Sequence, residues 1–181
     1  MIGPWLLLKS ELKLCGCLPS FVWLGTNLQQ VYRDFKELLL AFNAHNVEYL
    51  IVGAHALAAH GHVRATKDID VWVRPEPANA QKVLKALSDF GAPLRDLTAD
   101  DLSRKETVFQ IGVPPLRIDV ITDIDGVEFA DAWPDRLETS FGGVPTFVIS
   151  RQHLITNKKT AARLQDLADV QLLELTEDPC E

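Results

Sequence analysis

A short apolar run that ends in glycine, VEYLIVG at residues 47–53, constrains the fold more than any other feature of this chain. Its β-branched and aromatic residues are typical of a buried strand. An alanine-rich stretch at residues 54–60, followed by Gly61, favours a short helix. A second strand pattern, KDIDVWVR, occupies residues 67–74 and ends before Pro75. The sequence therefore predicts a strand, a helix and a second strand in direct succession.

The remaining segments continue this mixture of helices and strands. Apolar residues recur at helical spacing over residues 28–44, and Asn27 is the expected cap. Further patterns predict helices at 78–90 and 129–137, helical residues over 151–175, and strands at 107–112, 116–122 and 144–149. Residues 92–104 are polar and loop-like, and residues 113–115 join two strands as a hairpin. This order predicts an α+β fold, with a mixed β-sheet flanked by helices and a helical C-terminal part.

Length and charge limit the possible domains and partners. A chain of 181 residues suits one domain, which we expect at 27–176, after an irregular extension at 1–26 and before a tail at 177–181. The formal net charge of −7 argues against nonspecific binding to nucleic acid or membranes, but leaves a nucleotide ligand open. The three cysteines indicate no disulfide framework, and no apolar run reaches the roughly 18 residues that span a bilayer. These features predict a cytoplasmic protein without a membrane partner.

Acidic residues interrupt two of the predicted strands. Asp68 and Asp70 alternate with apolar residues, so both side chains project from the same face of one strand. Asp119 occupies a similar setting between Ile118 and Val120 on a later strand. Oxygen ligands without histidine or thiolate suit Mg²⁺ or Mn²⁺ rather than zinc. The alternative is a structural one, in which the aspartates pair with neighbouring cations: Arg64, Lys67 or Arg117.

The order of these motifs resembles the nucleotidyltransferase superfamily of DNA polymerase β type. The similarity rests on VGA at 52–54, RATKDID at 64–70, RID at 117–119 and NKKTAARLQDLAD at 157–169. It covers residues 28–175 and is closest to small bacterial members that include relatives of the AbiEii type IV toxins. Each motif is short, but their order and spacing together are fairly specific.

The resemblance implies a role for each aspartate and for the glycine turn. Asp68 and Asp70 would hold a Mg²⁺ or Mn²⁺ ion and the nucleotide phosphates, and Asp119 would complete the metal site and help to activate an acceptor hydroxyl. Gly53 would let the backbone approach the triphosphate, which agrees with the anion affinity of free amides at a helix start. Superfamily members commonly have Gly or Ser where this chain has Ala54, so a serine hydroxyl contact is not available here.

Polar residues around these motifs complete the expected nucleotide site. The resemblance adds Arg64, Thr66, Lys158 and Arg163 as nucleotide-binding residues, because cations neutralise the charge of the leaving pyrophosphate. The alternative is that Lys158 is a solvated helix residue and that Arg163 pairs with Asp166.

Three histidines and a tryptophan lie between or beside these motifs. The spacing of His55, His60 and His62 is poor for zinc, because five residues on a helix turn the first two side chains apart. His55 could contact a phosphate or base, and His60 is expected at a helix end. Trp72 shares the face of the aspartates, where packing is the better interpretation than stacking on a nucleobase.

These observations predict a metal-dependent enzyme that transfers a nucleoside monophosphate from an NTP to a hydroxyl and releases pyrophosphate. The acceptor could be RNA, protein or a small molecule, and no residue selects one NTP over another. One alternative is a non-catalytic binding module, such as a toxin–antitoxin or regulatory partner. Another is a carboxylate-metal phosphohydrolase, which would release free phosphate.

Overall fold

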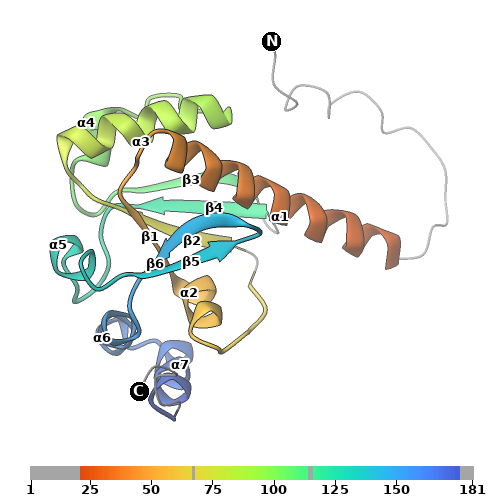
Figure 1. The fold of residues 1–181 in the computed structure, drawn as a ribbon, viewed down its shortest axis with the longest axis vertical. Coiled ribbons are helices and arrows are strands. Elements are labelled where there is room, and N and C mark those ends of the chain that lie inside the picture. Colours follow the sequence, from red (N-terminus) through yellow and green to blue (C-terminus); the bar gives the residue numbers. More distant parts are fainter. Residues whose placement is uncertain (1–20, 67, 114–115, 176–181) are drawn as a thin grey trace.

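The computed structural model describes residues 21–66, 68–113 and 116–175. Within these residues the chain forms helices and strands in mixed order (Figure 1). The helices are α1 (Phe21–Ala44), α2 (Gly53–Ala59), α3 (Pro77–Phe90), α4 (Ala99–Leu102), α5 (Phe129–Ala132), α6 (Arg151–Ala161) and α7 (Leu164–Leu175). The strands are β1 (Tyr49–Val52), β2 (Asp68–Val73), β3 (Val108–Val113), β4 (Leu116–Ile121), β5 (Leu137–Phe141) and β6 (Val144–Val148).

The described strands form one six-stranded sheet in the order β3-β4-β2-β1-β6-β5. Antiparallel pairs join β1 to β2, β3 to β4 and β5 to β6. Parallel pairs join β2 to β4 and β1 to β6, so strands that are distant in sequence become neighbours at the centre of the sheet. The predicted α+β fold with a mixed sheet is confirmed.

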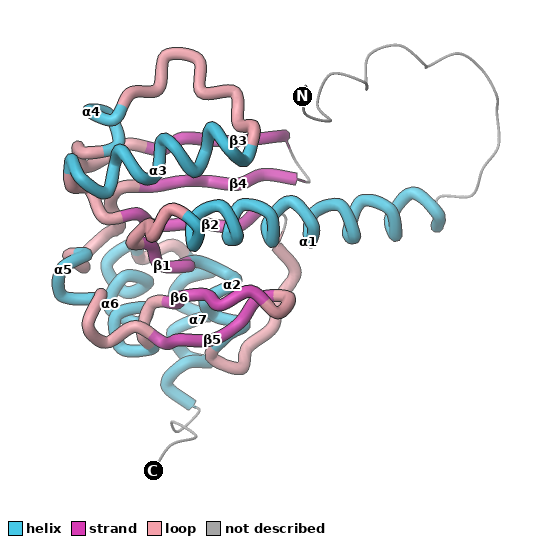
Figure 2. The backbone as a smooth tube through the Cα atoms, turned by 45° about the horizontal axis from the view of Figure 1, so that its top comes forward, coloured by secondary structure: helices cyan, strands magenta, loops and turns pink. Residues whose placement is uncertain are grey.

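Helices cover both faces of this sheet. Helices α1 and α3 pack against each other over one face, and α2, α6 and α7 lie on the other (Figures 1 and 2). The α1 and α3 side is apolar, with Phe35, Leu38 and Leu39 of α1 buried in the core. Helix α1 extends beyond the edge of the sheet at its N-terminal end (Figure 1).

The start of α1 differs from the sequence prediction. The helix begins at Phe21 rather than at residue 28, so Asn27 lies inside the helix and is not its cap. Helical backbone thus continues upstream of the segment with apolar periodicity. Residues 21–27 contain no proline that would block the backbone hydrogen bonds, and Gly25 lowers helix stability by only about 1 kcal/mol relative to alanine. Of the predicted extension at 1–26, residues 1–20 lie outside the described part of the chain, as does the whole of the predicted tail at 177–181.

Three further boundaries correct the sequence prediction. The predicted loop at 92–104 contains α4, whose first turn is closed by a capping box between Thr98 and Asp101. The helix expected at 129–137 ends at Ala132, and β5 follows as an edge strand with mostly exposed side chains. Because few of its residues are buried, β5 lacks the apolar pattern by which strands are recognised. The helical region 151–175 breaks at Ala162, where φ is +50°.

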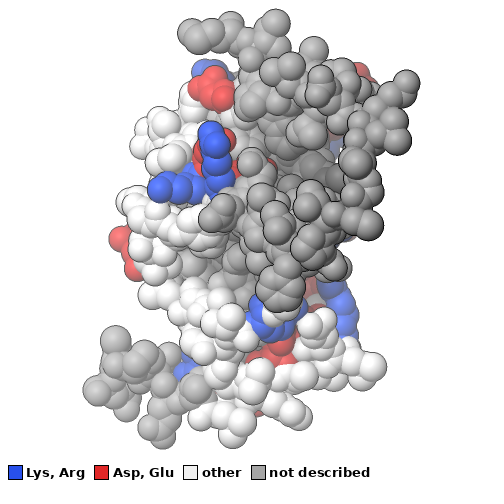
Figure 3. Space-filling view, turned by 90° about the vertical axis from the view of Figure 1, so that its right-hand side faces the viewer, with Lys and Arg blue, Asp and Glu red and all other residues white. Residues whose placement is uncertain are grey.

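Two further observations concern the surface charge and the hydropathy of the helices. On the face drawn in Figure 3, Lys and Arg atoms lie directly beside Asp and Glu atoms. Among the described helices, none combines the length and apolar character that crossing a bilayer requires.

Candidate active site

The parallel pairing of β2 with β4 brings the predicted acidic residues together. Its register aligns Asp68 with Arg117 and Asp70 with Asp119. Neighbouring strands lie about 4.8 Å apart, so paired residues present their side chains side by side on one face. Ile69, between the two aspartates of β2, points to the opposite face and is buried in the core. The sheet thus gathers three carboxylates that come from two separate segments of the chain.

Gly53 lies against one of these carboxylates. Its φ is +64°, and a Cβ atom built on it would lie 2.1 Å from Oδ2 of Asp70. Positive φ is costly for a residue with a side chain, and a contact of 2.1 Å is impossible between heavy atoms that are not bonded. Only glycine therefore fits at the turn from β1 into α2 while Asp70 keeps its position.

Burial and like charge raise the proton affinity of two aspartates. The pKa of Asp70 is raised to about 6, mainly by burial and then by the charges of Asp68 and Asp119, against the opposing effects of Arg117 and Arg163. Burial also raises the pKa of Asp119, and Arg117 opposes this shift. A second cation near these carboxylates would favour their ionised forms.

Arg117 is the closest cation to the aspartates. Its Nη2 atom lies 2.5 Å from Oδ2 of Asp68 and 2.9 Å from Oδ2 of Asp119. The sequence analysis considered Arg117 only as a cation that pairs with the aspartates, and the structure contains these ion pairs. Its side chain is 32% exposed, whereas Oδ1 of Asp119 is buried without a hydrogen-bond partner. Among the residues that the structure describes, no group of three or more His, Cys, Asp or Glu side chains is assembled to hold a metal.

Thr66 holds the first aspartate of β2. Its hydroxyl lies 3.2 Å from Oδ1 and 3.1 Å from the backbone oxygen of Asp68, as the donor in both contacts. The backbone N–H of Asp68 lies 3.4 Å from the same hydroxyl. Thr66, which the resemblance assigned to the nucleotide, therefore contacts a carboxylate within the protein.

Lys158 occupies a buried ionic cluster between α6 and α7. Its Nζ atom lies 2.6 Å from Oδ2 of Asp169 and 2.9 Å from Oδ1 of Asp166, and only 3% of its side chain is exposed. Arg64 approaches the same Asp169, with Nε 3.6 Å from Oδ2. The expectation of a solvated Lys158 is therefore wrong, because two carboxylates on the next helix compensate its burial. The DxxD spacing of Asp166 and Asp169 was visible in the sequence, but their partner was not.

Arg163 lies at the break between α6 and α7. Its side chain is largely exposed, and its Nε atom lies 3.6 Å from Oδ2 of Asp166. Its charge also acts on Asp70, where it opposes the raised pKa. The αL conformation of Ala162 turns the chain at this point, so the helix break places a solvent-accessible cation within electrostatic range of Asp70.

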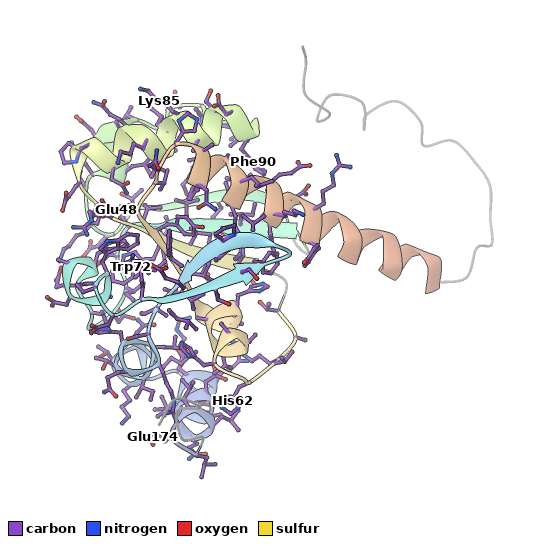
Figure 4. The ribbon with its side chains drawn as sticks, viewed as in Figure 1. Glu48, His62, Trp72, Lys85, Phe90 and Glu174 are labelled. Carbon is purple, nitrogen blue, oxygen red and sulfur yellow. The ribbon has the colours of Figure 1, made fainter. Side chains whose placement is uncertain are left out.

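His55, His60 and Trp72 take structural positions. His55 packs between the rings of Phe35 and Phe141 and lines a cavity of about 210 Å³, and burial lowers its pKa. His60 is the C-terminal cap residue of α2, as predicted, and its Nε2 lies 2.8 Å from the backbone oxygen of Ile149. Trp72 is 1% exposed and meets Phe129 of α5 edge-on, which confirms packing (Figure 4).

A mixed sheet with aspartates on adjacent parallel strands beside a glycine turn matches the class that the motifs indicated, a nucleotidyltransferase. Residues 26–178 match the family described as "Nucleotidyltransferase of unknown function (DUF6036)", and the chain belongs to this family. Its general reaction is transfer of a nucleoside monophosphate. No curated protein matches the sequence. The closer link to AbiEii relatives stays a prediction.

Solved structures share the fold at low sequence identity. The antibiotic-resistance factor ANT(2'')-Ia is 18% identical with a TM-score of 0.56, over 81% of this chain and 83% of that one. A complex of ANT(2'')-Ia with adenylyl-2''-tobramycin has a TM-score of 0.54 at 18% identity, over 80% and 87% of the two chains. The lincosamide antibiotic adenylyltransferase LnuA, bound to lincomycin, is 15% identical with a TM-score of 0.50, over 79% and 96%. These similarities support the nucleotidyltransferase fold.

Proposed function

We propose that this protein transfers a nucleoside monophosphate from an NTP to a hydroxyl group, with Mg²⁺ or Mn²⁺ held by Asp68, Asp70 and Asp119. The observation that carries the proposal is the register of β2 and β4, which aligns Asp70 with Asp119. Three carboxylates on one face repel one another, and a hard divalent cation relieves that repulsion.

The donor atoms fit such an ion. Every candidate ligand is a carboxylate oxygen, which Mg²⁺ and Mn²⁺ prefer. Oδ1 of Asp119 is buried without a partner, a costly state for an acceptor that a cation would remove. When bound, the ion would polarise the phosphate and neutralise its charge.

The chain's own residues would then bind and orient the reactants. The backbone at Gly53 and Ala54 would approach the triphosphate, because no Cβ intervenes beside Asp70. Asp119 would accept the proton of the acceptor hydroxyl while the hydroxyl oxygen forms its bond to the α-phosphorus. The bond to pyrophosphate breaks in the same displacement, and the leaving group keeps the electron pair. Arg163, exposed at the helix break, would offset the charge of the pyrophosphate.

Incorporation of α-labelled NTPs tests this function. The purified protein is incubated with each NTP, Mg²⁺ or Mn²⁺, and RNA, protein and small-molecule acceptors, including tobramycin and lincomycin. We expect labelled product and pyrophosphate from wild type, and loss of both with Asp70→Asn. Asp100→Asn removes an exposed carboxylate on α4 and is the matched control, expected to retain activity. Equal labelling by Asp70→Asn would contradict the proposal, and release of free phosphate would indicate a phosphohydrolase.

A non-catalytic binding module is the second candidate, and one observation favours it. Arg117 already pairs with Asp68 and Asp119, which leaves fewer carboxylate oxygens for a metal. Calorimetry separates the two functions. Nucleotide binding that is independent of Mg²⁺ and releases no pyrophosphate would support a regulatory or toxin–antitoxin partner.

A further inference from the structure

Arg117 lies between carboxylates of two neighbouring strands, β2 and β4. It begins the RID motif of β4, directly opposite Asp68 in the parallel register. A single nitrogen, Nη2, lies within 3 Å of carboxylate oxygens from both Asp68 and Asp119. One guanidinium thus neutralises carboxylates from two strands, which is also the task of a bridging metal ion.

This ion cluster is incompletely satisfied. Nε of Arg117 and Oδ1 of Asp119 are both buried, and neither has a hydrogen-bond partner. Asp70 shares the same face and has no ion pair with Arg117 within 4 Å among the described contacts. A guanidinium with five donors could satisfy more acceptors than it does here. The side chains of Arg117 and Asp68 are 32% and 31% exposed, so solvent reaches this pair, unlike a permanent bridge sealed in the core.

Arg117 is less enclosed than Lys158, the buried cation of the α6–α7 pair. Lys158 is 3% exposed and is held by two carboxylates of α7. The Arg117 side chain is 32% exposed, so a rotation of its flexible stem can carry the guanidinium into solvent. Departure of Arg117 would leave the carboxylates of Asp68 and Asp119 open on the face that carries Asp70.

We propose that Arg117 is a resident counter-cation, which neutralises the aspartates until a divalent metal displaces it. The displaced guanidinium then binds the triphosphate, whose oxygens match its planar donors. This inference rests on the proposed metal binding by Asp68, Asp70 and Asp119. In the metal-free state Arg117 pairs with the aspartates. In the metal-bound state the aspartates hold the ion and Arg117 holds the triphosphate.

The exchange has opposite effects on two measurable quantities. A metal that enters the wild-type site must break both ion pairs of Arg117, so the pairs weaken metal affinity. Removal of the guanidinium should therefore tighten metal binding. The same removal leaves uncompensated carboxylates in the metal-free protein and lowers its melting temperature. A structural arginine would instead support the ligands, and its removal would weaken metal binding.

Mn²⁺ binding measured by electron paramagnetic resonance tests the exchange without reliance on turnover. Wild type, Arg117→Gln and Arg117→Lys are compared, with Arg104→Gln as a control at an exposed position on the α4–β3 connection. We expect Arg117→Gln to bind Mn²⁺ about tenfold or more tightly than wild type, which corresponds to roughly 1.4 kcal/mol. Arg117→Lys keeps the charge and should lie between the two. Arg104→Gln should match wild type.

Two further readouts complete the test. Thermal unfolding should show a lower metal-free melting temperature for Arg117→Gln and a larger rise on addition of Mn²⁺. In Arg117→Gln, affinity for the Mn²⁺–ATP complex should fall relative to affinity for Mn²⁺ alone, because the guanidinium that binds the triphosphate is lost. Should Arg117→Gln prove unfolded, Arg117→Lys must still bind Mn²⁺ more tightly than wild type.

The outcomes separate this inference from the function on which it rests. If wild type binds Mn²⁺ and neither Arg117 variant binds it more tightly, the exchange is overturned while the proposed metal site stands. If only the Arg117 variants bind Mn²⁺, Arg117 blocks the site permanently, and both displacement and metal-dependent catalysis are overturned. Absence of Mn²⁺ binding by every variant overturns both.

Discussion

Gly53 and Asp70 exclude any side chain from the space between them. Gly53 ends the apolar run of β1 at a φ of +64°, and its missing Cβ leaves room for Oδ2 of Asp70, which would otherwise lie 2.1 Å away. The carboxylate of β2 and the turn that leads into α2 therefore fit each other only because residue 53 is glycine.

Gly53→Ala should displace Asp70 and so abolish the site while retaining a folded protein. Gly61→Ala is a matched control, because Gly61 also has positive φ but has nothing within 4 Å of its missing Cβ. Backbone strain should lower the free energy of unfolding by roughly 1–2 kcal/mol in both variants. Only Gly53→Ala should also lose Mn²⁺ binding and transfer activity. Equal activity of the two variants would show that the close approach has no functional role.

Lys158→Met tests whether the buried lysine stabilises the α6–α7 pair. Its removal leaves the buried Asp169 and the half-buried Asp166 without their closest cation, at a cost of about 3 kcal/mol in the free energy of unfolding. Lys159→Met removes the adjacent lysine, which is 54% exposed and pairs with Glu174, and should change stability by less than about 1 kcal/mol. Urea denaturation measures both.

Nucleotide binding distinguishes this structural role from the phosphate contact that the resemblance implied. If Lys158 acts only within the helix pair, the folded Lys158→Met protein should bind ATP with nearly wild-type affinity at low temperature. A large loss of ATP affinity without a loss of stability would instead favour a phosphate contact.

The pH dependence of the site should have opposite signs for stability and for metal binding. The pKa of Asp70 is about 6 in the folded protein, and an unfolded aspartate titrates near 3.9. Between these values the folded form binds more protons, so this group makes the free energy of unfolding fall as pH rises from about 4 to 6. Above pH 6 both states are ionised, and its contribution is constant.

Metal binding needs the ionised carboxylate and should strengthen over the same range. Below pH 6, Mn²⁺ affinity should fall by up to about tenfold per pH unit, since the ion must displace the proton of Asp70. Urea denaturation and Mn²⁺ titration at several pH values measure the two trends. Asp70→Asn should flatten the stability trend between pH 4 and 6, and an unchanged slope would assign it to another group.

The sequence predicted those parts of the site in which the residues concerned are close together in the chain. Strand alternation placed Asp68 and Asp70 on one face, and the run that ends at Gly53 identified the turn. The pairing of Asp70 with Asp119 required a parallel contact between strands about fifty residues apart, which the motif order suggested only through the family resemblance.

The missed features share a physical origin in long-range contacts. Lys158 has the local sequence of an exposed helix, and only the packing of α7 supplies the carboxylates that bury it. The bridging position of Arg117 depends on the register of β2 with β4. Strand β5 carries exposed side chains and is stabilised by its backbone pairing with β6, which leaves little apolar pattern in the sequence.

Thr66 should control metal binding through its hydrogen bonds to Asp68. Thr66→Val keeps the shape of the side chain but removes the hydroxyl that contacts Oδ1 and the backbone oxygen of Asp68. Because such supporting contacts orient a ligand, we expect Mn²⁺ affinity to fall by about tenfold or more. Thr66→Ser restores the hydroxyl and should recover most of that affinity. If Thr66 acts instead on the nucleotide, Thr66→Val would bind Mn²⁺ as wild type does and lose affinity only for ATP.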